Sequence, residues 1–66
     1  MTGEQLKIRR IALGITQQRL GEMLGYKGKS ALVTVQRWEY GTRPIPVKHY
    51  RQLAAILRID LDDIVP

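Results

Sequence analysis

The sequence predicts an all-α fold, a compact bundle of five helices, and three observations lead to that prediction. Apolar residues recur every three or four positions, which is the period of an amphipathic helix, and no stretch alternates convincingly as a strand does. Glycines and prolines fall between the periodic stretches, where helices end. With 66 residues and no cysteine, the chain must be stabilised by helix packing rather than by disulfides. We treat residues 1–66 as a single domain.

The first helix is predicted to begin after Thr2 and to end at Gly14. Thr2 can cap this helix, because Gln5 follows three residues later, as in a capping box. Gly14 tolerates the left-handed conformation that often follows a helix. The residues predicted to share the inner face are Leu6, Arg10 and Leu13.

The second helix is predicted to begin after Thr16, a suitable cap residue, and to end at Gly25. Gly21 lies in its middle, where a small residue lets another helix pass closely. The apolar stripe of this helix consists of Leu20, Met23 and Leu24.

The third helix is predicted over residues 31–40, with Ser30 as its cap and Gly41 as its stop. Helical spacing divides its side chains into two faces. The predicted inner residues are Leu32, Val35 and Trp38, and the predicted outward or flanking residues are Ser30, Val33, Thr34, Gln36 and Arg37.

Residues 42–46 are predicted to form a rigid connector, because Pro44 and Pro46 exclude regular helix there. Pro46 also suits the first turn of a fourth helix, and His49, the only histidine, is predicted on the surface of that helix. Asp60 can cap a short fifth helix. The apolar residues of the fourth helix, at helical spacing, are Val47, Tyr50, Leu53, Ala54 and Leu57.

The net charge of +5 is unevenly distributed along the chain. Residues 1–51 carry ten Lys or Arg against three Glu, whereas residues 52–66 carry one Arg against three Asp. A basic surface of this kind attracts a polyanion at long range, although charge alone also leaves open a basic domain with no such partner.

Composition argues against several other classes of function. No apolar run is long enough to span a membrane, and the N-terminus lacks the apolar core of a signal peptide. One histidine and no cysteine argue against a metal site. The chain has Ser30 and His49, which are residue types that enzymes use in catalysis. It has no glycine-rich nucleophile elbow and no pair of carboxylates spaced across a cleft. We therefore predict no enzyme activity, no cofactor and no small-molecule ligand.

The stretch from Leu13 to Gly41 satisfies the physical demands of a helix-turn-helix unit. Two helices must cross at close range, and the turn needs a residue that tolerates positive φ. The second helix must be apolar inside and polar outside. The residues that meet these demands, in order, are Gly21, Gly25, the pair Val35 and Trp38, and the pair Gln36 and Arg37.

Over nearly its whole length the chain resembles the lambda-repressor and Cro-like family, the XRE-type helix-turn-helix domains. It departs from that family at Gly21, where alanine is usual, and by about four extra residues between Gly25 and Val35. We assign the extra residues to the loop Tyr26–Lys29; the alternative is a longer start of the third helix, which could turn Leu32 toward DNA. The segments that match the family are Arg10 and residues 13–17, 20–21, 24–25, 35–41, 46 and 57–64.

The resemblance implies sequence-specific binding to duplex DNA by a homodimer on a palindromic operator, with the third helix in the major groove. It also implies a transcriptional regulator, in the first place a repressor, in a prokaryotic or phage setting, cytoplasmic and associated with the nucleoid. The dimer contact is expected near Leu57–Val65. A protein-interaction module such as an antitoxin or adaptor, with DNA binding secondary, shares the fold and is the alternative.

The outer face of the third helix holds the expected base contacts. Arg37 can donate bidentately to guanine, Gln36 can pair with adenine, and Val33 can meet a thymine methyl. By the resemblance, Gln17 touches a phosphate, and Arg43 is placed for another. The full set is Ser30, Val33, Thr34, Gln36 and Arg37 for bases, and Gln17, Lys27, Lys29 and Arg43 for phosphates.

Two further pairs of residues each have two possible interpretations. Arg10 and Glu39 match family positions that form a partly buried ion pair between the first helix and the end of the third, and the alternative is two solvated charges. Lys27 and Lys29 flank Gly28 and form either a phosphate clamp or an ordinary basic loop. Among the aromatic residues, Trp38 and Tyr50 are predicted in the core, and Tyr26 and Tyr40 stay open between packing and contact.

Overall fold

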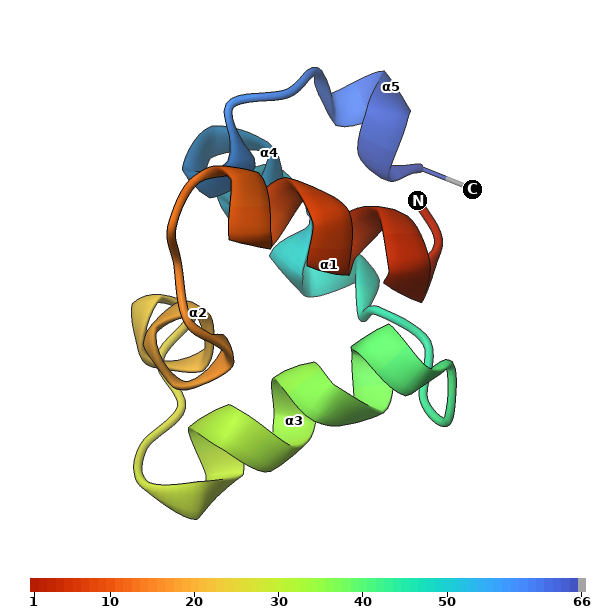
Figure 1. Cartoon of the computed structure of the whole chain (residues 1–66). Coiled ribbons are helices and arrows are strands. Elements are labelled where there is room, and N and C mark those ends of the chain that lie inside the picture. Colours follow the sequence, from red (N-terminus) through yellow and green to blue (C-terminus); the bar gives the residue numbers. More distant parts are fainter. Residues whose placement is uncertain (66) are drawn as a thin grey trace.

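The computed structural model describes residues 1–65, which fold into five α-helices and one 3-10 turn. In chain order the elements are α1 (Gly3–Ala12), α2 (Gln17–Met23), α3 (Lys29–Tyr40), η1 (Val47–His49), α4 (Tyr50–Leu57) and α5 (Leu61–Ile64). In Figure 1, α1 crosses the centre of the molecule, with α3 on one side of it and α5 on the other. None of the described helices is long and apolar enough to cross a membrane. The predicted all-α bundle of five helices is confirmed.

The predicted helix starts after Thr2 and Thr16 are also confirmed. Thr2 Oγ1 accepts a hydrogen bond from Gln5 N at 3.1 Å, and Gln5 Oε1 accepts one from Thr2 N at 2.9 Å, which completes the capping box. Thr16 Oγ1 accepts a hydrogen bond from Arg19 N at 3.0 Å. Each cap binds a backbone group three residues away, so local sequence is enough to predict it.

The start of α3 differs from the prediction. Ser30 does not cap this helix but lies in its first turn, and the cap position belongs to Gly28, which makes no side-chain hydrogen bond. Gly28 has φ 57°, a conformation that glycine adopts without strain because it lacks a Cβ. The helix therefore begins one residue before Ser30 and runs for 12 residues, about 18 Å at 1.5 Å per residue.

The predicted loop Tyr26–Lys29 is confirmed for Tyr26, Lys27 and Gly28, which lie in the connection between α2 and α3. Lys29 is the exception, because it already belongs to α3. The third helix thus begins at Lys29 instead of Ala31. This register buries Ala31 and leaves Leu32 on the flank of α3, outside the buried core cluster, so Leu32 is not the core residue that we predicted.

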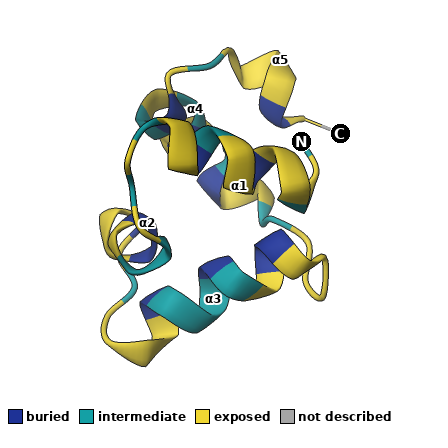
Figure 2. Ribbon diagram, in the orientation of Figure 1, coloured by how far each residue is buried: buried dark blue, intermediate teal, exposed yellow. Residues whose placement is uncertain are grey.

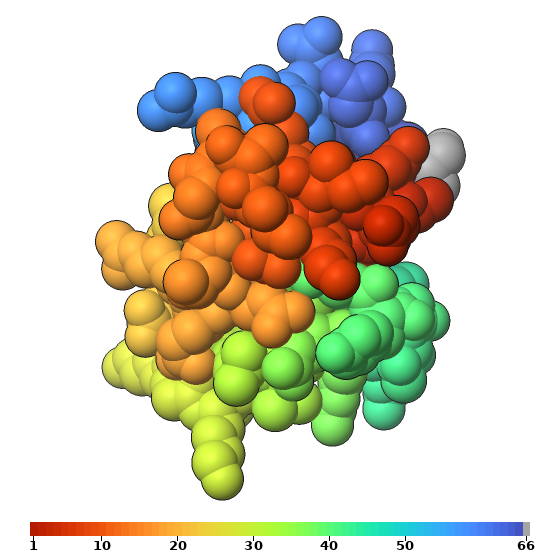
Figure 3. Space-filling model, viewed as in Figure 1, coloured from red at the N-terminus to blue at the C-terminus, as the bar shows by residue number. Residues whose placement is uncertain are grey.

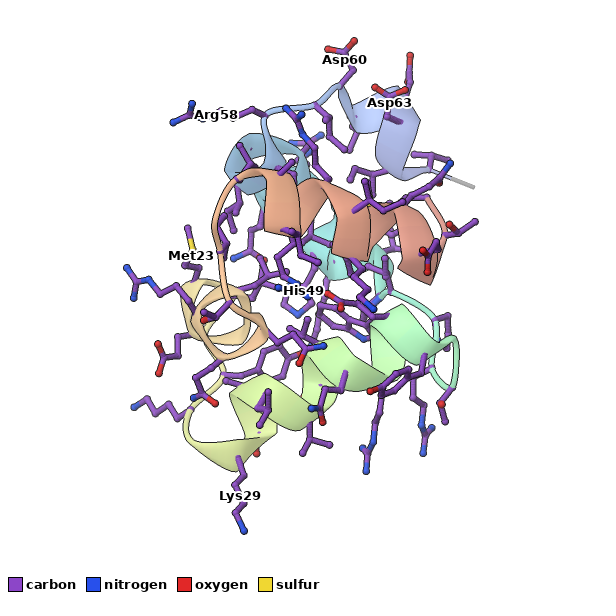
Figure 4. All side chains as sticks on the ribbon, viewed as in Figure 1. Met23, Lys29, His49, Arg58, Asp60 and Asp63 are labelled. Atoms are coloured by element: carbon purple, nitrogen blue, oxygen red, sulfur yellow. The ribbon has the colours of Figure 1, made fainter. Side chains whose placement is uncertain are left out.

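The core lies between the first four helices and is closed by α5. Its buried apolar residues are Leu6, Leu20, Leu24, Ala31, Val35, Trp38, Leu53, Leu57 and Ile64. The predictions for Met23 and Val47 are wrong, since these side chains are 41% and 75% exposed. Met23 is the last residue of α2 and points outward (Figure 4). Val47 is the first residue of η1, and His49 is the residue of this turn that is buried.

His49 is buried at the centre of the molecule, which corrects the prediction of a surface histidine (Figure 4). Its Nδ1 lies 2.7 Å from Gln52 Oε1, and its Nε2 lies 2.9 Å from the hydroxyl of Tyr26. Its ring also lies against Trp38, with the ring centroids 5.7 Å apart. The buried histidine is tolerated because both ring nitrogens have partners. The same contacts show that Tyr26 packs inside the fold.

Two glycines let α3 lie unusually close to its neighbours. A Cβ at Gly21 of α2 would come within 2.6 Å of the Ala31 Cα, so only glycine fits beneath the first turn of α3. A Cβ at Gly3 of α1 would come within 2.6 Å of the Glu39 carbonyl oxygen, near the other end of α3. Both ends of α3 therefore rest on positions without a side chain.

The substitution Gly21→Ala tests this close approach. A glycine inside a helix is normally less stable than alanine by about 0.5–1 kcal/mol, so an unhindered substitution would stabilise α2. We expect the opposite sign here, a loss of about 1–3 kcal/mol in the free energy of unfolding, because the new Cβ overlaps the backbone of Ala31. Thermal unfolding followed by circular dichroism measures the change, at about 4–8 °C in Tm per kcal/mol.

The matched control is Glu22→Ala, the next residue of the same helix, which is exposed. It should change the free energy of unfolding by less than about 0.5 kcal/mol. A higher Tm for Gly21→Ala would contradict the close contact between α2 and α3.

Candidate nucleic-acid interface

One side of α3 faces the core and the other faces solvent. The buried residues of the helix are Ala31, Val35, Trp38 and Glu39. The opposite side, here called the outer face of α3, carries Lys29, Ser30, Val33, Arg37 and Tyr40, with Thr34 and Gln36 at its margins. Figure 2 shows the same division, with the buried positions of α3 turned toward α1 and the exposed and intermediate positions turned away.

The five predicted base-contacting residues all lie on the outer face of α3 or at its margins. Ser30 and Arg37 are exposed, and the other three are partly buried. Four of the five line one depression of about 240 Å³ together with Lys29. The residues of this depression are Lys29, Ser30, Val33, Thr34 and Arg37. Gln36 lies apart from them, where its amide meets Gln17 of α2.

The connector that follows α3 adds a second arginine beside the outer face. Arg43 is exposed and lines a depression of about 320 Å³ together with Arg37 and Thr34. The backbone N–H of Arg43 donates to the carbonyl of Arg37 at 3.3 Å, so the turn after α3 keeps the two arginines near each other. The remaining wall of this depression is made by Trp38, Pro44 and Pro46.

Two lysines flank the cap of α3. Lys29 projects away from the body of the molecule in Figure 4, and the start of α3 protrudes in the space-filling view of Figure 3. Lys27 is exposed in the connection between α2 and α3. Asp60 and Asp63 lie at the opposite end of the molecule (Figure 4). Lys29 and these two carboxylates therefore lie far from each other.

A buried ion pair holds the C-terminal part of α3 against α1. Arg10 Nε lies 2.7 Å from Glu39 Oε2, and Arg10 Nη2 lies 3.0 Å from Glu39 Oε1. The two side chains are only 9% and 2% exposed, so they are not solvated surface charges. Arg10 Nη1 also donates to the carbonyl of Ile15 at 2.8 Å, in the turn before α2. Because this contact has two points, it constrains the rotation of α3 as well as its distance from α1.

Gln17, which the resemblance assigns to a phosphate, is hydrogen-bonded inside the protein. Its Nε2 donates to Glu39 Oε1 at 3.0 Å, and its Oε1 accepts a hydrogen bond from Gln36 Nε2 at 3.4 Å. The second N–H of its amide has no partner among residues 1–65. Sequence reasoning missed these contacts, because Gln17 and Glu39 are 22 residues apart and meet only when α2 packs on α3.

Tyr40 is an outer-face residue that the sequence left without a role. Its side chain is 77% exposed, so it does not pack in the core. It follows Arg37 by three positions on the same helix, which was the available signal for a shared face. Its hydroxyl extends the polar surface of α3 to the end of the helix.

Removing one partner of the buried ion pair should be far more damaging than removing a surface charge. Glu39→Ala leaves the guanidinium of Arg10 buried without its counter-ion, so we expect a loss of about 3–5 kcal/mol in the free energy of unfolding. The double variant Arg10→Met/Glu39→Leu should recover much of this loss, because no charge is then buried alone. Urea titrations of the wild-type chain, of Glu39→Ala and of the double variant measure their free energies of unfolding. A Glu39→Ala chain at least as stable as the double variant would contradict this account of the ion pair.

Comparison with known proteins agrees with this geometry of two closely crossing helices, α2 and α3. The helix-turn-helix family matches residues 6–64 of the chain. No curated protein and no solved structure gives a significant match. With nearly the whole chain covered by the family match, this protein belongs to the XRE-type, lambda-repressor-like helix-turn-helix family of DNA-binding regulatory domains.

Proposed function

We propose that the chain is a transcriptional repressor that recognises a specific duplex DNA sequence with α3 in the major groove. The observation that supports this proposal is the outer face of α3, which carries hydroxyl, amide and cationic side chains on a helix anchored from its other side. A major groove about 12 Å wide admits such a helix with its side chains. Occupation of an operator excludes other proteins from the same DNA, which is the basis of repression.

In this docking, the outer face of α3 reads the bases. Arg37 donates to guanine, Gln36 pairs with adenine, and Val33 contacts a thymine methyl group. Ser30 and Thr34 line the same depression as Val33, and their hydroxyls serve neighbouring polar groups of the base edges. The exposed cations around this face, together with the second N–H of Gln17, contact phosphates and set the orientation of the helix. The cations in this role are Lys27, Lys29 and Arg43.

We further propose a two-fold dimer on a palindromic operator, with half-sites about one helical turn, ~34 Å, apart. In the expected contact region near Leu57–Val65, Leu57 and Ile64 are buried in the core and are not available to a second copy. Leu61 and Val65 are 40% and 48% exposed, and they are the apolar side chains of this region that a second copy can cover.

A second candidate function, a protein-interaction module such as an antitoxin or adaptor, is favoured by a different surface. Ile8 and Ile11 of α1 are 60% and 57% exposed and lie three positions apart on one helix. A protein that covered these side chains would make DNA binding secondary. Failure of the purified chain to enrich any duplex motif would favour this candidate.

Selection from a randomised duplex library at near-physiological salt tests the proposed function. The purified chain should enrich a palindromic motif, and the double variant Gln36→Ala/Arg37→Ala should lose the enrichment. Arg37→Ala alone should lower the affinity for the selected operator by about 1–3 kcal/mol and relax the preference at one base pair. Salt-sensitive binding with no enriched motif would contradict sequence-specific recognition by this chain. If Arg37→Ala lowered the affinity for every duplex equally, Arg37 would instead be a phosphate contact.

Lys29→Ala should weaken binding to all duplexes to a similar extent, because a phosphate contact carries no base information. The slope of log K against log salt concentration should become shallower by about one, since fewer counter-ions are released. Arg58→Asn is the control, because Arg58 lies at the opposite end of the molecule (Figure 4), and asparagine tolerates its left-handed backbone of φ 57°. The same slope change in both variants would show general charge attraction rather than a contact at α3.

A further inference from the structure

Val33 is an apolar residue on the outer face of α3, and the packing of the fold does not account for it. Its side chain is half-buried, yet within residues 1–65 it belongs neither to the buried core cluster nor to the side chains packed against that cluster. It lines the depression of about 240 Å³ on the outer face, where the other four lining residues carry hydroxyl or cationic groups. A β-branched valine in a helix is restricted at χ1, so Val33 forms a stiff apolar wall in a polar depression.

Arg37 lines the same depression and follows Val33 by four positions. Side chains at this spacing are neighbours on a helix, with Cβ atoms about 5–6 Å apart. Successive bases of one DNA strand are about 3.4 Å apart along the duplex axis, so two such side chains can face adjacent base pairs. A group of the DNA that enters the depression therefore meets both the valine side chain and the guanidinium.

The proposed contact of Arg37 with guanine determines which base lies beside its guanidinium. The planar guanidinium donates two parallel hydrogen bonds to O6 and N7 of guanine, so it lies in the plane of that base. In right-handed DNA one of its flat faces then covers the major-groove edge of the preceding base on the same strand. If that base is a pyrimidine, a methyl group on its C5 points into the groove beneath this face.

We propose that the depression receives the C5-methyl group of a pyrimidine that directly precedes the guanine read by Arg37, so that the chain distinguishes methylated from unmethylated cytosine at a CG step. The methyl group is held between the side chain of Val33 and the flat face of the guanidinium. The inference rests on the proposed function and deepens it, because it joins two separate base contacts into one site and names the chemical group that this site takes. Thymine and 5-methylcytosine share this group, whereas uracil and unmodified cytosine lack it.

The methyl group contributes affinity because it covers apolar surface that otherwise faces water. Without it, water in the depression lies against the hydrocarbon of Val33, which offers no hydrogen bond. The methyl group also gains dispersion contacts with the valine and with the guanidinium. Burial of one such group corresponds to about a three- to fivefold gain in affinity. This gain involves no change in charge, so it should be nearly the same at low and at high salt concentration.

Four matched duplexes test the proposal with the wild-type chain. On the operator recovered by selection, Arg37→Ala first identifies the guanine, as the base pair at which this variant relaxes the preference. In one half-site the base directly 5′ of this guanine is then made thymine, uracil, 5-methylcytosine or cytosine, each opposite its complementary base. Thymine should bind about three- to fivefold more tightly than uracil, and 5-methylcytosine should exceed cytosine by a similar factor. Each comparison keeps the base pair and changes only the methyl group.

Val33→Ala should reduce both gains to less than about twofold, because it removes the apolar wall and leaves Arg37 in place. The matched control is Leu32→Ala, at the neighbouring position of α3. Leu32 is also apolar and half-buried and lies outside the buried core cluster, but it does not line the depression. This control should keep both gains. Because two duplexes are compared within each variant, a general loss of stability does not change the ratio of their affinities.

Equal affinities within the two pairs of duplexes would overturn the proposal, and so would a gain in only one of the two comparisons. Gains that survive Val33→Ala would also overturn it, since the depression would then not be the site that takes the methyl group. The proposed function fails in a different way. In that case the wild-type chain would enrich no motif, or Arg37→Ala would weaken binding to every duplex equally.

Discussion

The position of α3 depends on the ion pair between Arg10 and Glu39. Its two side chains are 9% and 2% exposed, and a charge left alone at such a place is strongly destabilising, so α1 and α3 must approach each other in the one way that pairs them. The opposite end of α3 is fixed by a different constraint, the contact of Ala31 with Gly21, where no side chain fits. An electrostatic contact at one end and a steric contact at the other leave α3 little freedom to rotate or slide.

Because α3 is anchored from one side only, its other side stays exposed and available for the DNA contact that we propose. None of the outer-face residues belongs to the buried core cluster, so their identities can serve binding without weakening the fold. The acidic residues of α5 lie at the far end of the molecule, and they do not oppose an approaching polyanion at α3. Glu39 connects the two sides, since the carboxylate that neutralises Arg10 also orients Gln17. One buried carboxylate thus contacts both α1 and α2.

The sequence by itself determined those features that have a local physical cause. The caps at Thr2 and Thr16 act on backbone groups three residues away, so the starts of α1 and α2 could be predicted from neighbouring residues. Helical spacing likewise placed Val33 and Arg37 on one face, because the period of a helix does not depend on its surroundings. The helix-turn-helix pattern likewise predicted a small residue at Gly21, although alanine would also have satisfied that pattern.

Tertiary structure decided what depends on contacts between distant residues. Ser30 was the predicted cap of α3, and local sequence did not reveal that the helix begins at Lys29, with Gly28 at the cap position and Ala31 packed on Gly21. The burial of His49 depends on Tyr26 and Trp38, which come from two other parts of the chain. The same holds for the candidate site, where Gln17 meets Glu39 across 22 residues. A local bond is encoded within one turn of helix, whereas these contacts exist only after packing has set the distances between helices.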